Sequence, residues 1–94
     1  MKILNIHIVL FFLVTLIIGC NNNSEYSKSN ELLNSGNQLF KLGKYKEALS
    51  TYQEGVSHES TVILLSNIGT AFEELAELDS AEFYFRKAVN KDDN

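Results

Sequence analysis

The thiol and imidazole side chains of this chain are those of Cys20, the only cysteine, and of the two histidines, His7 and His58. A thiol can act as a nucleophile, as a metal ligand or as a site of modification, and a histidine can transfer protons. These three residues are not spaced as zinc ligands are, and a single cysteine cannot form a disulfide within the chain. The sequence therefore predicts no metal site and no cofactor.

His58 and the adjacent Glu59 form a sequence-local pair that could perform general acid–base catalysis. The pair falls between two expected helices, where an exposed turn is the commoner interpretation. The sequence contains no glycine-rich phosphate loop and no pair of carboxylates expected to converge. Cys20 is followed by asparagines rather than by the basic residues that activate a thiol. We therefore expect no catalytic residues and a protein that is not an enzyme.

The charge balance bears on the class of partner. The chain of 94 residues has 12 acidic and 8 basic side chains, a net charge of −4. Proteins that bind nucleic acid need a basic face that displaces counterions from the phosphates. We therefore expect no nucleic-acid partner, and the length allows one small domain at most.

Residues 1–19 have the pattern of a secretory signal peptide. A basic start at Lys2 precedes the apolar run Ile8–Ile18, which is 11 residues long, and the small residue Gly19 stands directly before Cys20. A membrane-spanning helix needs about 20 apolar residues, whereas about 10–14 suit a signal peptide. An uncleaved amino-terminal anchor with an incidental cysteine is the alternative interpretation.

The residues Ile17-Ile18-Gly19-Cys20 resemble the lipobox of bacterial lipoproteins, in which two aliphatic residues and a small one precede a cysteine. The resemblance implies that residues 1–19 are removed and that Cys20 carries a diacylglyceryl group, often with a further acyl chain. Two or three such chains hold a protein stably at a membrane. The implied location is the bacterial cell envelope, in the periplasm or at the cell surface. The outer membrane is slightly favoured because Asn21 is not an aspartate.

Residues 20–29 are expected to be a flexible tether after the lipidated cysteine. Tyr26 is the only large apolar side chain between residues 21 and 29. Such a stretch buries too little apolar surface to offset the entropy lost on ordering. The folded part is therefore expected to begin at residue 30.

Two segments of the remainder, residues 36–56 and 69–89, match at a constant offset of 33 residues. Self-similarity at such a period is typical of helical solenoids. We therefore expect two repeat units, at about 30–60 and 61–94. The aligned pairs include Gly36–Gly69, Leu39–Phe72, Ala48–Ala81, Tyr52–Phe85, Gly55–Ala88 and Val56–Val89.

Apolar residues recur at helical spacing in both halves of each unit, which predicts four helices in two antiparallel hairpins and an all-α fold. Gly43 is expected to end the first helix, and Ser60 or Thr61 to cap the third. Asp79, followed by Glu82, is expected to mark the start of the fourth helix. The core face of that helix is expected to contain Leu78, Ala81, Phe85, Ala88 and Val89.

Gly36 and Gly69 lie in the middle of expected helices, where each should cost about 1 kcal/mol relative to alanine. Their recurrence at the same register indicates that another helix crosses too closely for a side chain. We expect the small residues Ala48 and Ala81 to meet them.

The spacing of these residues resembles the tetratricopeptide repeat over about residues 30–94. Departures include Ser35 where an aliphatic residue is usual, Gly55 for alanine and Ala76 for a turn glycine. The resemblance implies a short solenoid that binds proteins or peptides on a concave face formed by the first helix of each pair. Carried over to this sequence, that face comprises Leu33, Asn37, Phe40, Lys41, Ile63, Ser66, Thr70, Glu73 and Glu74.

The resemblance also bears on ligand and edge contacts. Some relatives bind a terminal carboxylate, and Asn37 and Asn67 lie near such positions, but most of the accompanying basic residues are missing.

Phe83 and Tyr84 cannot both face the same core as Phe85, because successive helical residues point about 100° apart. We expect one of them to stay partly exposed and to contribute to an edge contact with another copy or another protein.

The resulting functional hypothesis is a membrane-anchored scaffold whose repeats bind a protein or peptide. The alternative is a small structural subunit, or a truncated repeat protein, that completes a larger helical assembly through its carboxy-terminal edge.

The intact mass of the protein extracted from membranes tests the anchor. We expect a chain that begins at Cys20 and carries the added mass of two or three acyl chains. Cys20→Ser should abolish that mass and leave residues 1–19 attached, because the thioether requires sulfur. A wild-type chain that keeps Met1 and carries no acyl group would disprove the lipoprotein interpretation.

Overall fold

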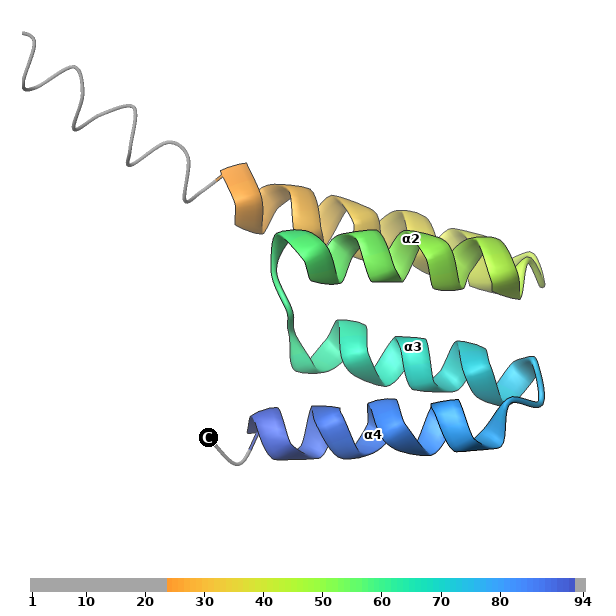
Figure 1. Ribbon diagram of the computed structural model, residues 1–94. Helices are drawn as coiled ribbons and strands as arrows, with labels where there is room; N and C mark the ends of the chain where they lie inside the picture. Colours follow the sequence, from red (N-terminus) through yellow and green to blue (C-terminus); the bar gives the residue numbers. More distant parts are fainter. Residues whose placement is uncertain (1–23, 93–94) are drawn as a thin grey trace, which may run out of the picture.

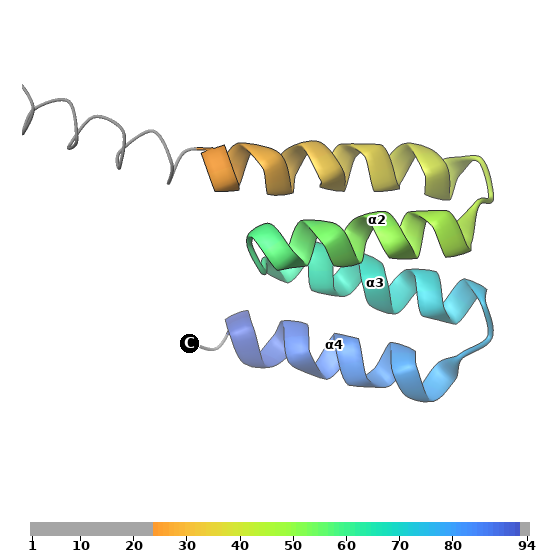
Figure 2. The same cartoon turned by 45° about the horizontal axis from the view of Figure 1, so that its top comes forward.

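The computed structural model describes residues 24–92, and these residues form four helices without a strand. Residues 24–41 are helical, followed by α2 (Tyr45–His58), α3 (Val62–Glu74) and α4 (Leu78–Asp92). Consecutive helices run antiparallel, so that the chain forms two helical hairpins packed against each other (Figures 1 and 2). The predicted all-α fold of two stacked hairpins is confirmed. The predicted signal peptide and Cys20 lie outside the described residues.

Both hairpins turn through the same hydrogen-bonded motif. In the first turn the Lys44 amide donates to the Leu39 carbonyl at 3.0 Å, around Gly43 with a φ of +77°. In the second the Glu77 amide donates to the Phe72 carbonyl at 2.9 Å, around Ala76 with a φ of +61°. These bonds satisfy carbonyls that the helix end leaves free. The expected stop at Gly43 is confirmed, and Ala76 adopts the left-handed conformation that glycine adopts at the equivalent position.

The helix starts agree in part with the sequence. The Thr61 hydroxyl oxygen accepts a hydrogen bond from the Leu64 amide at 3.2 Å, which confirms one of the two expected caps of α3. The expected start of α4 at Asp79 is wrong, because the helix already begins at Leu78 and Asp79 lies in its first turn. The Glu82 carboxylate bonds instead to the Arg86 guanidinium, at 2.6 Å.

The described part of the expected tether is helical rather than extended. Residues 24–29 continue directly into the helix that reaches residue 41, so the expected boundary at residue 30 is wrong. Ser29 is buried, and its hydroxyl donates to the Glu59 carbonyl at 3.0 Å. Glu25 lies 2.7 Å from the His58 ring nitrogen. These contacts hold the segment against the loop between α2 and α3, a stabilisation that a polar composition does not reveal.

The two mid-helix glycines allow close packing, as expected, but their partners are aromatic rings. A Cβ atom on Gly36 would lie 2.4 Å from the Tyr52 ring, and one on Gly69 would lie 2.6 Å from the Phe85 ring. The nearest neighbours of the two glycines are therefore these rings, and not the expected Ala48 and Ala81. Both alanines are buried, and the glycines provide room for the flat rings of the following helix.

The core lies between the hairpins. Ala48 and Tyr52 of α2 pack with Leu64 and Ile68 of α3, and each is at most 2% exposed. The core positions expected on α4 are confirmed only in part: Ala81 and Ala88 are buried, but Leu78 and Val89 are 66% and 59% exposed. The residues of the first unit that are equivalent to Leu78 and Val89 lie on α2, and α3 packs against α2. No described helix covers the corresponding side of α4. No described helix is long and apolar enough to cross a membrane.

The paired turns give a backbone prediction. Ala76→Gly should raise the free energy of unfolding by about 1 kcal/mol, because a left-handed conformation is unfavourable for a residue with a Cβ atom. Gly43→Ala, with no atom within 4 Å of the added Cβ, should lower it by about the same amount. Urea denaturation with an unchanged m-value measures both. Equal effects of the same sign on the free energy of unfolding would contradict the left-handed conformation at these two turn positions.

Candidate functional site

The expected binding face lies along helix 24–41 and α3, which are neighbours in the fold. The Asn67 side-chain amide donates to the Asn37 Oδ1 at 3.0 Å and so joins the two helices at mid-length. Around this pair lies a pocket of about 100 Å³, lined by Asn37, Phe40, Tyr52, Asn67 and Thr70. The structure therefore brings together three of the predicted residues, namely Asn37, Phe40 and Thr70. We call this site the asparagine pocket.

A phenol and two amides form the floor of the asparagine pocket. The Tyr52 hydroxyl donates to the Asn37 Oδ1 at 2.7 Å, so that this oxygen accepts two hydrogen bonds. Burial raises the pKa of the Tyr52 phenol. Within residues 24–92 the Asn37 amide nitrogen and the Asn67 amide oxygen have no further partner. The cluster therefore presents one donor and one acceptor to a ligand.

A second hollow of about 90 Å³ lies toward the start of the same two helices. Its lining includes the predicted residues Leu33 and Ile63, together with Tyr26. Ile63 and Tyr26 are 60% and 62% exposed, an unusual exposure for large apolar side chains. We call this site the apolar hollow; its full lining is Tyr26, Ser29, Asn30, Leu33, Thr61, Ile63 and Leu64.

The two hollows follow one another along the same pair of helices, and we call them together the groove. Leu33 and Asn37 are one helical turn apart, as are Ile63 and Asn67, so each pair lies on one face of its helix. The distance along the helix from Tyr26 to Phe40 is about 21 Å at a rise of 1.5 Å per residue. An extended chain of about six residues covers that length. Among residues 24–92, no charged side chain lines either hollow.

The other predicted face residues lie outside these hollows. Lys41, Glu73 and Glu74 are exposed near the carboxy-terminal ends of their helices. Ser66 is half-buried, and its carbonyl accepts a hydrogen bond from the Thr70 hydroxyl at 3.1 Å. Lys41, Glu73 and Glu74 therefore lie at one end of the groove and do not form its floor.

The two aromatic residues expected at the edge have different surroundings. Tyr84 stacks on Phe72 with ring centroids 5.6 Å apart, and it is half-buried. Phe83 is 59% exposed and lies with its ring 5.9 Å from the Lys87 ammonium. The expectation that one of the pair stays exposed is thus met by Phe83.

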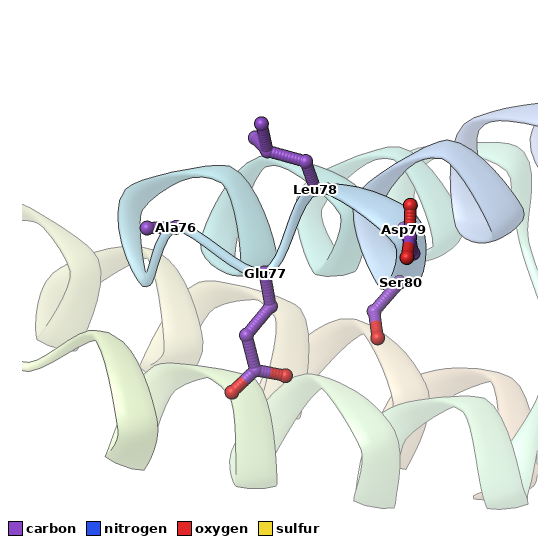
Figure 3. Close-up of a pocket in the computed structure, with 5 residues that line it drawn as sticks. All are labelled: Ala76, Glu77, Leu78, Asp79 and Ser80. Atoms are coloured by element: carbon purple, nitrogen blue, oxygen red, sulfur yellow. The ribbon is translucent and has the colours of Figure 1, made fainter.

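His58 has a hydrogen-bond partner that the sequence did not indicate. His58 bonds to Glu25 of helix 24–41 rather than to the adjacent Glu59. The pair connects helix 24–41 to the end of α2. A separate shallow hollow at the turn before α4 contains Glu77 and Asp79, and Figure 3 shows the Glu77 side chain directed away from that of Leu78. Among the described residues no group of three or more His, Cys, Asp or Glu side chains is placed to hold a metal ion.

Comparison with protein-family models, with curated proteins and with solved structures finds no match to this chain. The groove is therefore characterised by its own geometry. The face predicted from the sequence omits several residues that line the two hollows. Among them are Tyr26, which the sequence places in the tether, and Tyr52, which it indicates only as a position of the repeat. The polar tip of Tyr52 was the available signal, because a buried phenol needs a hydrogen-bond partner.

Tyr52→Phe tests the polar floor. The loss of the hydrogen bond to Asn37 should lower the free energy of unfolding by about 1 kcal/mol. Because burial raises the pKa of the folded phenol above the unfolded value of 10.0, the unfolded state ionises first as the pH rises. The stabilisation linked to the phenol's protonation is thus fully present below pH 10 and is lost at higher pH.

Urea denaturation between pH 8 and pH 11 measures this effect. Subtracting the Tyr52→Phe profile from that of the wild type removes every contribution that the two proteins share. A difference between the two profiles that stays constant across this range would contradict the predicted pH dependence.

Proposed function

We propose that this chain is a lipid-anchored protein of the bacterial cell envelope, built from tetratricopeptide-like repeats, whose groove binds an extended segment of a partner protein. The observation that carries the proposal is the pair of uncharged hollows between helix 24–41 and α3, in which an apolar hollow is followed by a pair of amides. The lipobox resemblance of residues 17–20 supports the anchor.

The lining defines the ligand's chemistry. Tyr26, Leu33 and Ile63 offer apolar surface to one large apolar side chain of the partner. One turn further along, the Asn37 amide nitrogen can donate to a peptide carbonyl and the Asn67 amide oxygen can accept from a peptide N–H. A free carboxylate would need a cation that the lining lacks. The ligand is therefore an internal, uncharged segment of a protein rather than its carboxy terminus.

The alternative function, a structural subunit, concerns α4 rather than the groove. The two functions use different surfaces, and they can therefore be tested by separate substitutions.

Site-specific crosslinking in membranes tests the groove. Benzoylphenylalanine replacing Phe40 should crosslink to a partner, whereas the same group replacing the exposed Gln53 of α2 should not. Adding Ile63→Lys should reduce the crosslink from position 40 about tenfold, because the ammonium would be desolvated against an apolar ligand. Gln53→Lys, the matched control, adds the same charge on α2 and should leave the crosslink unchanged.

The side chain of Ile63 is exposed, so its replacement should leave the fold intact, and circular dichroism checks this. Equal crosslinking in the Ile63→Lys and Gln53→Lys proteins would rule out the groove as the binding site.

A further inference from the structure

The outward side of α4 has an apolar stripe formed by Leu78, Phe85 and Val89. Residues spaced by seven and four positions fall within about 40° of one another around a helix. Leu78 and Val89 are 66% and 59% exposed, and Phe85 is half-buried against Gly69. We call these three residues the α4 stripe. Isolated exposed apolar residues are ordinary, but an aligned set on one helix indicates a contact surface.

The internal repeat indicates what kind of contact this surface makes. The stripe residues are the 33-residue equivalents of Tyr45, Tyr52 and Val56 on α2. In the first unit Tyr52 is 2% exposed and Val56 packs against the core that contains Leu64 and Ile68 of α3. The α4 stripe therefore keeps the side chains with which the preceding unit packs against a helix.

A second copy cannot cover the stripe with its first helix in the way that α3 covers α2. The α3 residues Leu64, Ile68 and Ala71 are at most 1% exposed. Their equivalents on helix 24–41 are polar and exposed, namely Glu31, Ser35 and Gln38. Burying these groups without partners would be costly. A head-to-tail chain of copies is thereby disfavoured, and a contact between two α4 helices about a two-fold axis is the arrangement that matches apolar surface with apolar surface.

The charges beside the stripe match such a two-fold contact. Glu82 stands where the first unit has the half-buried Leu49, and its carboxylate pairs with Arg86 at 2.6 Å. Both side chains are largely exposed, at 60% and 77%. When two α4 helices pair antiparallel about a point near residue 84, Leu78 lies opposite Val89 of the second copy. Glu82 lies opposite its Arg86, within about one residue's rise of 1.5 Å.

We propose that α4 pairs with α4 of a second copy of this chain, antiparallel about a two-fold axis, through the α4 stripe and reciprocal Glu82–Arg86 ion pairs. The contact leaves the groove between helix 24–41 and α3 free on both copies. It does not depend on the function proposed for that groove. Two helices of 15 residues present a small surface, so the dimer is expected to be weak in solution.

Charge reversal in the full-length chain tests the pairing. Two copies with different affinity tags are co-expressed, crosslinked with formaldehyde in intact cells so that a weak contact is retained, extracted in detergent and purified through one tag. Wild-type copies should co-purify. An E82R chain has two cations at the contact and an R86E chain has two anions. Each variant paired with itself should therefore lose at least fivefold in recovery of the second tag.

The mixed pair is the decisive sample. Co-expression of the E82R chain with the R86E chain places cations opposite anions, so the recovery of the second tag should return to the wild-type level. An ion pair within one copy cannot produce this rescue. Glu54→Arg, an equal charge reversal at an exposed position of α2, should leave recovery unchanged. Circular dichroism confirms that each variant is folded.

Three outcomes would overturn the proposal. One is the absence of co-purification of wild-type copies. The second is equal recovery for all pairs, which would reflect shared detergent micelles. The third is a loss of co-purification for the E82R pair that the mixed pair does not restore, which would mean that something other than a second α4 covers the stripe.

Discussion

The packing of Tyr52 determines much of this structure. Its ring occupies the space that a Cβ atom on Gly36 would need, so the first hairpin can close only with glycine there. The same ring forms part of the buried core with α3, which joins the two hairpins. Its hydroxyl reaches Asn37 on the groove side. One side chain therefore sets the spacing within a hairpin, contributes to the contact between hairpins and fixes the polar floor of the groove.

The second unit repeats this packing with a different outcome. Phe85 lies on Gly69 as Tyr52 lies on Gly36. However, Phe85 has no hydroxyl, and no described helix covers its outward side. The two ends of the stack consequently differ in chemistry. The first helix presents Glu31, Ser35 and Gln38 outward, whereas α4 presents Leu78 and Val89. A stack with one polar and one apolar end can add a neighbour at one side only. That asymmetry favours a closed pair over an open chain of copies.

The groove combines surfaces that are separate along the sequence. Residues near positions 26–40 supply one wall, residues 61–70 supply the other, and Tyr52 comes from a third helix. Its lining has no charge, and its two amides are held in place by each other and by the phenol. Amides that are fixed before a ligand arrives lose little side-chain entropy on binding. The chemistry therefore suits a peptide backbone better than a charged group.

The sequence by itself determined the number of helices in the described part, their antiparallel order, the turn at Gly43 and the cap at Thr61, because spacing and local hydrogen bonding are properties of neighbouring residues. It also indicated Leu33, Asn37, Phe40, Ile63 and Thr70 as groove residues. Only the tertiary structure decided which groups meet. It placed aromatic rings against the two glycines, made residues 24–29 helical and left Leu78 and Val89 exposed. Burial at each of these positions depends on whether a distant segment covers it, and the periodicity of a single helix does not contain that information.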